Sequence, residues 1–503
     1  MSNEQVFDVV VVGSGGGAMT AAHLAAKHGL STVVVERTDK VGGTSAYSGG
    51  ACWLPGTQVQ QRFGIADSTE SARTYLAALL DDPQTEKVEA FLAEAPRLVA
   101  ELESDDLMEF EFTPFPEYYD RPGRVSGGRS IQPSAIKRDE LPEQVDALLR
   151  PPVEKDRAGE RGRRTLTGGQ ALIGRLLAMF VRDGGTVLTG HQMTELVTDG
   201  DRVTGIVAQT DSGPVTISAR RGVILASGGY EGDQARRDAR AVPGSAEWTM
   251  APQGTNQGEP IDAAAAVGAA TALLNEGWYC PGLAHPDGWG SFTLGFRSGL
   301  MVDQTGKRYA NECLPYDRFG REMAKAPERI PSWYLFDNTE GGQFPAIAMP
   351  QGDPAGHLAA GTWVQADTVE ELAEKLGIPA ITETVKRFNG FAETGVDEDF
   401  GRGDDEFDTN FVFVDNGKNK ALVPLANAPF FAAKFVLSDL GTKGGVVTDA
   451  SARALREDGS AIPGLYATSN ATASLFGAYY PGPGAPLGSA MVFGSLAVRD
   501  LLG

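Results

Sequence analysis

Apolar residues near the start of the chain form a short uninterrupted run, Val9–Val12, which leads into a glycine-rich turn and then an alanine-rich stretch. This order is typical of a buried strand, a tight turn and a helix. A second β-branched run, Ser31–Val35, follows and ends at Glu36. The two runs predict a β-α-β unit, and such a unit implies a doubly wound parallel sheet.

Helical patterns next predict helices over residues 71–80 and 86–103. We expect Thr85 to cap the second helix, and Pro96 to kink or break it because proline lacks the N–H that an inner helical turn uses. Residues 121–164 are rich in arginine, proline and glycine and have little periodicity. That composition favours a solvated surface loop or an insertion.

Short apolar runs separated by turns dominate the next part of the chain. They occupy residues 186–188, 193–197, 203–209 and 215–218, and a buried run over 222–229 then ends in glycines. Runs of this length with turn residues between them are typical of antiparallel strands. The pattern predicts a β-meander that leads back to the central sheet.

The α/β rhythm breaks after residue 270 and resumes near residue 428. The stretch between holds aromatic-rich loops and a predicted helix over 368–376, for which Asp367 and Glu370 would form a capping box. We therefore predict an α/β fold in which a Rossmann-like, doubly wound nucleotide-binding domain with a β-meander contains an inserted α+β domain. The predicted limits are 1–270 and 428–503 for the first domain and 271–427 for the second.

The glycine-rich turn after the first strand fits the dinucleotide-binding pattern G-x-G-x-x-G/A, with Gly13, Gly15 and Ala18 at the three positions. The first glycine permits the turn, the second lets backbone N–H groups approach a pyrophosphate, and the third permits close packing of helix on strand. Glu36 ends the second strand, where a carboxylate can accept a hydrogen bond from a ribose hydroxyl. A glycine-rich turn with no ligand is the alternative. The same predicted site includes Ser14, Gly16, Gly17 and Arg37.

The composition of the chain limits the classes of ligand and partner that it is expected to bind. The net charge of −22 argues against nucleic acid and anionic membrane surfaces as partners. Three scattered cysteines and five scattered histidines predict neither a disulfide framework nor a metal site. No basic leader and no apolar run of about 18 residues is present in the sequence, so we expect a cytoplasmic protein without an integral membrane segment.

Several motifs resemble the fumarate reductase-like flavoprotein superfamily, which binds FAD through both ends of the chain. They are Gly42–Ser45, Ala226–Gly229, Gly464–Asn470 and, in the inserted domain, Gly299–Glu312. The resemblance implies non-covalent FAD and a catalytic capping role for the inserted domain. It also implies that the helix start over 484–491 approaches the flavin ring, where its dipole would stabilise negative charge. The cofactor-binding residues that it adds are Gly43, Thr44, Ser45, Ala226, Gly228, Asn470, Pro486, Leu487 and Gly488.

Two departures disfavour a fumarate reductase. Tyr316 occupies the position where those enzymes carry a proton-delivering arginine, and Gly441 occupies the position of a histidine that holds the dicarboxylate. The remaining pattern resembles the 3-ketosteroid Δ1-dehydrogenases, in segments 13–18, 42–49, 53–58, 115–119, 314–320, 437–445 and 479–484.

That resemblance implies FAD-dependent 1,2-desaturation of the A-ring of a 3-ketosteroid. Tyr316 would remove the C2 proton with Tyr118 as its helper, while the hydride from C1 goes to the flavin. The Tyr480 hydroxyl and the Gly484 N–H would stabilise the negative charge on the C3 oxygen. A tyrosine is a weak base at neutral pH because its ordinary pKa is ~10, so we expect activity to rise toward alkaline pH.

Other interpretations stay open. Most tyrosines are packing residues with a satisfied hydroxyl, Tyr119 is one step from Tyr118, and Tyr47 is a weaker candidate for lining the flavin. The chain could instead be a 3-ketosteroid Δ4-(5α)-dehydrogenase, a reductase of a non-steroid enone or acrylate, or a flavin-bearing electron carrier.

Arg308 and Glu312 are expected to hold the inserted domain together. The electron acceptor could be a quinone, oxygen or a redox protein. The apolar walls predicted for the steroid are Trp53, Leu54, Phe115, Phe292 and Phe296.

Overall fold

The computed structural model describes residues 5–160, 162–412 and 418–503, and the chain divides into two compact units. The first unit comprises Met1–Arg240, Ala251–Gly277 and Gly441–Gly503, and the second comprises Ala241–Met250 and Trp278–Leu440. Most of the predicted insertion, 271–427, falls in the second unit, while residues 271–277 belong to the first. Residues 241–250 and 428–440, predicted for the first domain, belong instead to the second unit.

The first unit is built on an eight-stranded sheet with the strand order β21-β22-β11-β1-β2-β8, in which β10 also pairs with β11 and β9 pairs with β10. Strands β1, β2, β8, β11 and β22 pair in parallel. The four residues Val9–Val12 are buried, as expected for a parallel strand that is covered on both faces. The predicted α/β fold class is confirmed. The strand bounds are β1 Gln5–Val12, β2 Thr32–Val35, β8 Thr186–Leu188, β21 Arg453–Leu455 and β22 Ala461–Ala467.

The meander consists of β9 (Gln192–Asp199), β10 (Arg202–Thr210) and β11 (Gly213–Leu225). Two parts of the prediction were wrong. Residues 186–188 do not belong to the meander, because β8 pairs in parallel with β2. The runs 215–218 and 222–225 form one strand, which pairs antiparallel with β10 at its start and parallel with β22 at its end. One strand thus joins the meander to the central sheet.

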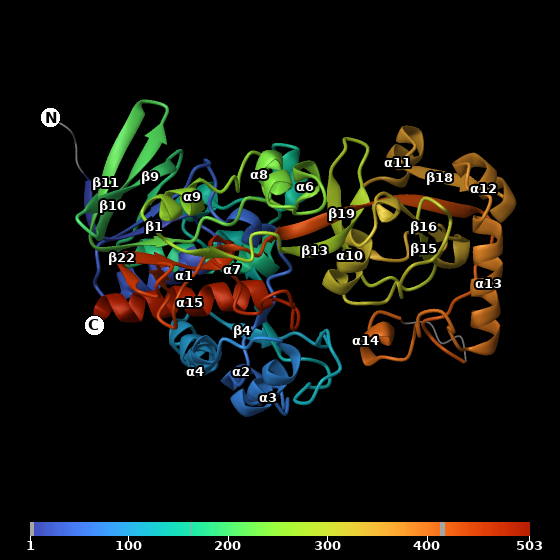
Figure 1. Cartoon of the computed structure of the whole chain (residues 1–503), viewed down its shortest axis with the longest axis horizontal. Helices are drawn as coiled ribbons and strands as arrows, with labels where there is room; N and C mark the ends of the chain where they lie inside the picture. The colour runs from blue at the N-terminus through green and yellow to red at the C-terminus, as the bar shows by residue number, and fades with distance from the viewer. Residues whose placement is uncertain (1–4, 161, 413–417) are drawn as a thin grey trace. The chain divides into compact units, whose positions relative to one another are not determined.

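Two helices pack closely beneath this sheet, α1 (Gly16–Lys27) and α15 (Ala485–Leu502), which runs beside α1 in Figure 1. A β-carbon at Gly17 would lie 2.7 Å from the carbonyl oxygen of Ala490, and one at Gly494 would lie 2.6 Å from the carbonyl oxygen of Gly17. Only glycines permit this approach. Helix α15 is long and apolar enough to cross a membrane, but 61% of it is buried inside the protein, as in a core helix.

Helix α4 (Thr85–Leu102) continues through Pro96, so the expected break is wrong. Its first residue is Thr85, and Gln84 occupies the cap position predicted for Thr85. A proline inside a helix costs about 3 kcal/mol. Phe91, Leu92 and Leu98 are buried on either side of it, and each such side chain contributes roughly 1.5–3 kcal/mol. Burial of this face therefore outweighs the lost hydrogen bond.

The arginine-rich segment 121–164 is folded rather than a solvated loop, which corrects the expectation. Three of its arginines are buried, and each of them pairs with a carboxylate: Arg129 with Glu117 and Asp67, Arg138 with Asp146, and Arg150 with Asp156. A guanidinium is tolerated inside a protein when it is paired and hydrogen-bonded. The segment contains β5 Ser130–Pro133, β6 Ile136–Lys137, α5 Glu143–Leu148 and α6 Val153–Arg157.

Further elements complete the first unit: η1 Gly43–Tyr47, β3 Cys52–Trp53, α2 Gln58–Arg62, α3 Thr69–Leu79, β4 Phe110–Phe112, β7 Thr165–Leu166, α7 Gly168–Arg182, α8 Gln234–Ala239, α9 Glu259–Ala266, β12 Thr271–Ala272 and β20 Gly445–Val446.

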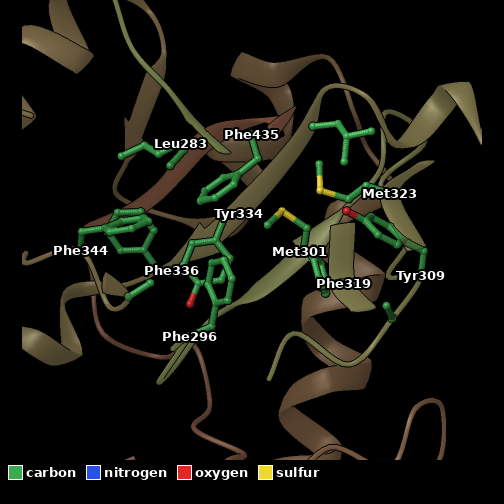
Figure 2. Packing of buried hydrophobic residues seen from close by; sticks show 14 of the residues in the cluster. Leu283, Phe296, Met301, Tyr309, Phe319, Met323, Tyr334, Phe336, Phe344 and Phe435 are labelled. Carbon is green, nitrogen blue, oxygen red and sulfur yellow. The ribbon is translucent and has the colours of Figure 1, made fainter. Parts of the chain in front are cut away.

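The second unit has a seven-stranded sheet in the order β15-β16-β19-β13-β14-β17, with β18 beside β19. Its core holds many aromatic side chains, and Figure 2 shows Phe336 and Phe435 near Tyr334, whose ring centroid lies 5.9 Å from theirs. The strands are β13 Gly277–Ala284, β14 Gly290–Leu294, β15 Leu300–Val302, β16 Ser332–Phe336, β17 Ile347–Met349, β18 Trp363–Ala366 and β19 Phe430–Thr442. The helices are α10 Tyr316–Ala324, α11 Pro354–Ala360, α12 Val369–Leu376, α13 Ile381–Thr394 and α14 Glu406–Thr409.

The cap of α12 lies one residue later than predicted. The Thr368 hydroxyl accepts a hydrogen bond from the Glu371 N–H, and the Glu371 carboxylate accepts one from the Asp367 N–H. The capping pair is therefore Thr368 and Glu371, not Asp367 and Glu370. Both pairs have the three-residue spacing of a capping box. The residue at which the helix begins decides which pair caps it.

A buried ionic network holds the second unit together, as expected for Arg308 and Glu312. The Arg308 guanidinium contacts the carboxylates of Glu312 at 2.8 Å and Asp397 at 2.9 Å. Arg402, fully buried, contacts the same Glu312 at 3.0 Å. The arginines lower the pKa of Glu312 although burial opposes them. This network joins β15, the loop before α10 and the loop after α13.

Candidate active site

The glycine-rich turn lies against three other segments of the first unit. A β-carbon at Gly13 would lie 2.5 Å from the Ala226 carbonyl oxygen, so no larger residue fits. Gly15 is the N-cap residue of α1, and the Gly16 N–H donates to the Ser45 hydroxyl at 3.0 Å. The structure thus brings Ala226 and Ser45 to the turn on which the sequence centred the dinucleotide site.

The start of α15 also reaches this turn. A β-carbon at Gly16 would lie 2.3 Å from Leu487 Cδ1. Gly484 is the N-cap residue, and no side chain caps the helix. The N-terminal amides of such a helix favour an anion or a partial negative charge. Pro486 lies in the first turn, and a β-carbon at Gly488 would lie 2.5 Å from the Trp53 carbonyl oxygen, so the helix start is tightly packed.

Glu36 is held in place from both sides at the end of β2. One carboxylate oxygen accepts the Ser14 hydroxyl at 2.6 Å, and the other accepts the N–H and hydroxyl of Thr38 at 2.9 Å each. The Ser14 oxygen in turn accepts the Gly42 N–H at 2.9 Å. Ser14 therefore connects the first turn, the second strand and the 42–45 segment. Arg37 makes a different contact, an ion pair with Glu259 of α9 at 3.4 Å.

Arg150 is a neighbour of this site that the sequence did not reveal. Its guanidinium is buried and donates to the Thr38 hydroxyl at 2.7 Å and to Asp156 at 2.6 Å. The Tyr47 hydroxyl donates to the same Asp156 carboxylate, and burial together with this bond raises the Tyr47 pKa above its usual range. Arg150 lies far from Thr38 in the sequence and in a stretch without periodicity, so no local signal marks it.

The residues around the turn fit a dinucleotide such as FAD. The hydroxyl oxygens of Thr44 and Ser227 are buried and have no hydrogen-bond partner within the described part of the chain. Both lie in segments beside the glycine turn. Buried polar groups in proteins are nearly always hydrogen-bonded, so these two hydroxyls point to a polar ligand. Phosphate and ribose oxygens have the required chemistry.

Gly441, in the first unit, has no room for a side chain. Its φ is +125°, and a β-carbon would lie 2.2 Å from Asn470 Nδ2 and 3.1 Å from the Glu231 carboxylate. Glu231 is buried and accepts the Thr442 N–H at 3.1 Å. A β-carbon at Gly228 would lie 2.5 Å from Asn256, whose amide donates to Glu231. A side chain at position 441, such as the histidine expected there in a fumarate reductase, would have to adopt a φ of +125° and would require the Asn470 side chain to move.

Tyr118 and Tyr480 pack against each other in the first unit. Their ring centroids lie 5.1 Å apart at 58°, and the two side chains are 1% and 2% exposed. Phe115 packs on the other side of Tyr118, at 6.1 Å. Tyr119 packs instead on Tyr479, at 5.8 Å. Neighbouring tyrosines in each of the two loops thus form separate pairs, Tyr118 with Tyr480 and Tyr119 with Tyr479.

The loop from Tyr480 to Gly484 is fixed by its carbonyl oxygens. The Pro481 oxygen accepts the Tyr118 N–H at 3.1 Å and the Tyr75 hydroxyl at 2.8 Å. The Pro483 oxygen accepts the Ser130 hydroxyl at 2.6 Å. Gly484 has a φ of +81°, and a β-carbon there would lie 2.1 Å from the Ala51 carbonyl oxygen. Each of these groups ties the loop to a different segment of the first unit.

A fully buried ionic cluster supports this loop. Arg129 contacts Glu117 at 2.6 Å and Asp67 at 2.7 Å. The Trp53 indole N–H donates to Glu117 at 3.1 Å, and the Trp53 backbone N–H donates to the Gly484 carbonyl oxygen at 3.1 Å. Burial raises the pKa of Glu117, and the Arg129 guanidinium opposes that effect. Trp53 was predicted as a steroid wall, and its fully buried ring stacks on Phe91 at 5.9 Å.

Tyr316 lies in the second unit, as the first residue of α10. Its ring meets the Phe292 ring edge-on, with centroids 4.8 Å apart. The next residue, Asp317, accepts the Tyr279 N–H at 3.1 Å and pairs with Arg321 at 2.9 Å, which fixes the start of the helix. Negative charge is favoured at a helix N-terminus. Tyr316 thus lies buried at the N-terminal end of α10.

Comparisons with known proteins agree with these features. A family model described as FAD binding domain matches residues 8–487. The chain is 38% identical to 3-oxosteroid 1-dehydrogenase of Rhodococcus opacus, with 98% of each chain covered. It is 34% identical to 4-oxocyclohexanecarboxylate 2-dehydrogenase of Sinomonas cyclohexanicum, with 99% of this chain and 93% of that one covered. The crystal structure of 3-ketosteroid Δ1-dehydrogenase from Sterolibacterium denitrificans in complex with 1,4-androstadiene-3,17-dione superposes with a TM-score of 0.90, 31% identity and 99% of each chain covered.

Proposed function

The chain belongs to the FAD-dependent flavoprotein family of the 3-oxosteroid 1-dehydrogenases, and from this premise we propose that it desaturates the C1–C2 bond of a 3-ketosteroid A-ring. The observation that carries the proposal is the loop of Tyr480 and Gly484, which is held by Tyr118, Ser130 and Trp53 through backbone carbonyl oxygens. A rigid loop is what a pair of donors aimed at one substrate oxygen requires.

In this proposal the cofactor site consists of the glycine turn, Glu36, the 43–45 segment, Ala226, Gly228, Asn470 and the first turn of α15. Arg150 joins it by orienting Thr38 and through it Glu36. FAD, when bound without a covalent link, supplies the acceptor for the hydride that leaves C1. The N-terminal end of α15 favours negative charge beside the cofactor.

The protein's own groups act on the ketone and on the C2 proton. The Tyr480 hydroxyl and the Gly484 N–H donate hydrogen bonds to the C3 oxygen, and each such donor stabilises the transition state by about 3 kcal/mol. The C2 proton becomes acidic as charge moves onto that oxygen. Tyr316 removes this proton, and Tyr118 assists by holding or passing it.

We propose a cytoplasmic location, with a quinone, oxygen or a redox protein as the electron acceptor. A dehydrogenase of a smaller cyclic ketone is the second candidate, because a relative that is 34% identical is a 4-oxocyclohexanecarboxylate 2-dehydrogenase. Both candidates share the chemistry of proton removal beside a ketone and differ in the size and charge of the substrate. A fumarate reductase is disfavoured by the closed surroundings of Gly441.

Anaerobic titration of the purified protein distinguishes these candidates. We expect 4-androstene-3,17-dione to bleach the flavin absorption band and to yield a product with a new C1–C2 double bond by mass spectrometry and NMR. Bleaching by 4-oxocyclohexanecarboxylate alone would replace the steroid proposal with the second candidate. A product desaturated at C4–C5 from a 5α-saturated ketosteroid, without a C1–C2 double bond, would assign the Δ4 reaction instead.

A further inference from the structure

Lys443 is a buried lysine that directly precedes two glycines in the segment 440–445. Its side chain is 1% exposed, and its ammonium donates to the carbonyl oxygens of Ala478 and Tyr479, each at 3.0 Å. These two carbonyls belong to the residues immediately before Tyr480. The ammonium therefore binds the backbone on the N-terminal side of the tyrosine that is proposed to contact the C3 oxygen.

The backbone of Lys443 is itself fixed. Its N–H donates to the Glu276 carbonyl oxygen at 2.9 Å, and its carbonyl oxygen accepts the Ser474 N–H at 3.0 Å. Thr442, the residue before it, is held by the buried Glu231 carboxylate through both its N–H and its hydroxyl. The ammonium thus extends from a rigid base to the 478–480 backbone.

The C-terminal side of Tyr480 is fixed separately, because the Pro481 carbonyl oxygen accepts two hydrogen bonds from Tyr75 and Tyr118. Tyr480 is therefore held between two anchors, a charged one before it and a neutral one after it. Burying an ammonium is unfavourable unless the charge is well hydrogen-bonded. A neutral donor could also satisfy the two carbonyl oxygens. A charged donor binds them more strongly, because hydrogen bonds from an ionised group are roughly twice as strong as neutral ones.

We propose that Lys443 is a positioning residue for the reaction: by binding the Ala478 and Tyr479 carbonyls it sets the direction in which the Tyr480 hydroxyl meets the C3 oxygen of the substrate. This inference rests on the function proposed above for Tyr480. A donor displaced by about 1 Å can lose ~100-fold in rate, so removal of the charged anchor is expected to act on the chemical step more than on binding.

The test is a double-mutant cycle between Lys443→Met and Tyr480→Phe, read by the rate of anaerobic flavin reduction at saturating 4-androstene-3,17-dione. In the wild-type background K443M should lower this rate by ~10- to 100-fold, with a smaller change in the steroid concentration for half-saturation. In the Y480F background the same substitution should lower it less than about threefold, because residues that act as a unit are not additive. Equal losses in both backgrounds would overturn the inference.

A second readout reports on the hydrogen bond without turnover. Donors to the C3 oxygen lower the carbonyl stretching frequency of bound 1,4-androstadiene-3,17-dione, and K443M should reverse part of that shift, as Y480F does. K443R keeps the charge and should recover part of both the rate and the shift. If K443M does not retain FAD, K443R is compared with the wild type instead. Because the longer guanidinium must move the two carbonyls, an unchanged flavin-reduction rate and an unchanged carbonyl frequency in K443R would overturn the inference.

Lys87→Met is the matched control. Lys87 is also a buried lysine of the first unit, but its ammonium lies 3.3 Å from the Thr448 hydroxyl and over the Phe493 ring. K87M should leave the carbonyl frequency unchanged, and a shift equal to that of K443M would overturn the inference. Wild-type protein that no steroid reduces would overturn the proposed function and this inference with it. Normal wild-type reduction with an additive cycle would overturn only the inference.

Discussion

The rings of Tyr118 and Tyr480 lie 5.1 Å apart, and the N–H of Tyr118 donates to the carbonyl oxygen of Pro481, the residue after Tyr480. Side chain and backbone therefore join the same two segments, which are distant in the sequence. Tyr118 and Tyr480 are therefore best treated as one packed pair.

Tyr480→Phe removes one proposed donor to the C3 oxygen while the ring remains to pack on Tyr118. We expect the rate of flavin reduction by 4-androstene-3,17-dione to fall by about 100- to 1000-fold, the loss found when one such donor is removed. Tyr119→Phe is the control, because Tyr119 pairs with Tyr479 instead. A loss in Y119F as large as in Y480F would contradict the assignment of roles.

Tyr316→Phe removes the proposed base. In the wild type, the logarithm of the flavin-reduction rate should rise by about one per pH unit below the pKa of the base, which is ~10 for an ordinary tyrosine. Y316F should reduce the rate and remove this slope. Stopped-flow measurements between pH 6 and 10 (roughly the range over which proteins stay folded) test both points, and a Y316F variant with the wild-type slope would place the base elsewhere.

Gly441→Ala tests the steric exclusion at the segment before Lys443. The new methyl group must adopt a φ of +125° and would overlap Asn470 Nδ2 at 2.2 Å, so we expect a loss of about 3 kcal/mol in stability. Gly477→Ala is the matched control: its φ is +55° and nothing lies within 4 Å of the new atom. That change should cost only about 1 kcal/mol. Thermal midpoints of the two variants should differ accordingly, and equal midpoints would refute the clash.

Arg129→Met removes one member of the buried cluster beneath the loop. Breaking such a pair costs about 3–5 kcal/mol because the partner's charge stays buried. Burial already raises the pKa of Glu117, so without the guanidinium the folded protein retains a proton that the unfolded chain releases. The loss of stability should therefore be smallest in acid and grow as pH rises above about 4.5.

The control for this cluster is Arg97→Met, because the Arg97 side chain is 65% exposed where it pairs with Glu94. Exposed pairs contribute about 0–1 kcal/mol. Thermal unfolding at pH 5 and pH 8 should therefore separate the two arginines. A melting temperature of R129M within a degree of R97M at both pH values would show that the cluster does not support the fold.

His23 in α1 should make the first unit sensitive to acid. Burial lowers its pKa from 6.5 to about 4, although Asp183 opposes that shift. Because the folded state binds this proton more weakly than the unfolded state, stability is complete above pH 6.5 and is lost as pH falls toward 4. The expected loss is about 3 kcal/mol.

His23→Leu should remove this part of the acid sensitivity, measured as the change in melting temperature between pH 7 and 5. His28→Leu is the matched control, since His28 lies just beyond α1, is half-exposed and pairs with Glu101 at 2.8 Å. If H23L kept the wild-type pH dependence, another group would be responsible for it.

Local pattern was sufficient for the parts of the site that lie close together along the chain. The glycine turn, Glu36 and the two strands around them follow from one β-α-β unit, and the meander follows from short runs and turns. Each of these needs only neighbouring residues, because turns and strands are decided by backbone conformation and alternation. The tyrosine roles came from family resemblance, and they stay predictions.

The amino-acid sequence by itself thus determined the fold class, the dinucleotide turn and the candidate tyrosines. Only the tertiary structure decided that α4 passes through Pro96, that residues 186–188 join the parallel sheet, and that Arg150, Arg129 and Lys443 lie beneath the two parts of the site. The physical reason in each case is a contact between segments that are distant in the sequence, such as the pairing of residues 186–188 with β2. A charged or proline residue is tolerated in the interior when distant segments supply burial or hydrogen-bond partners, and such long-range contacts leave no periodic signal in the chain.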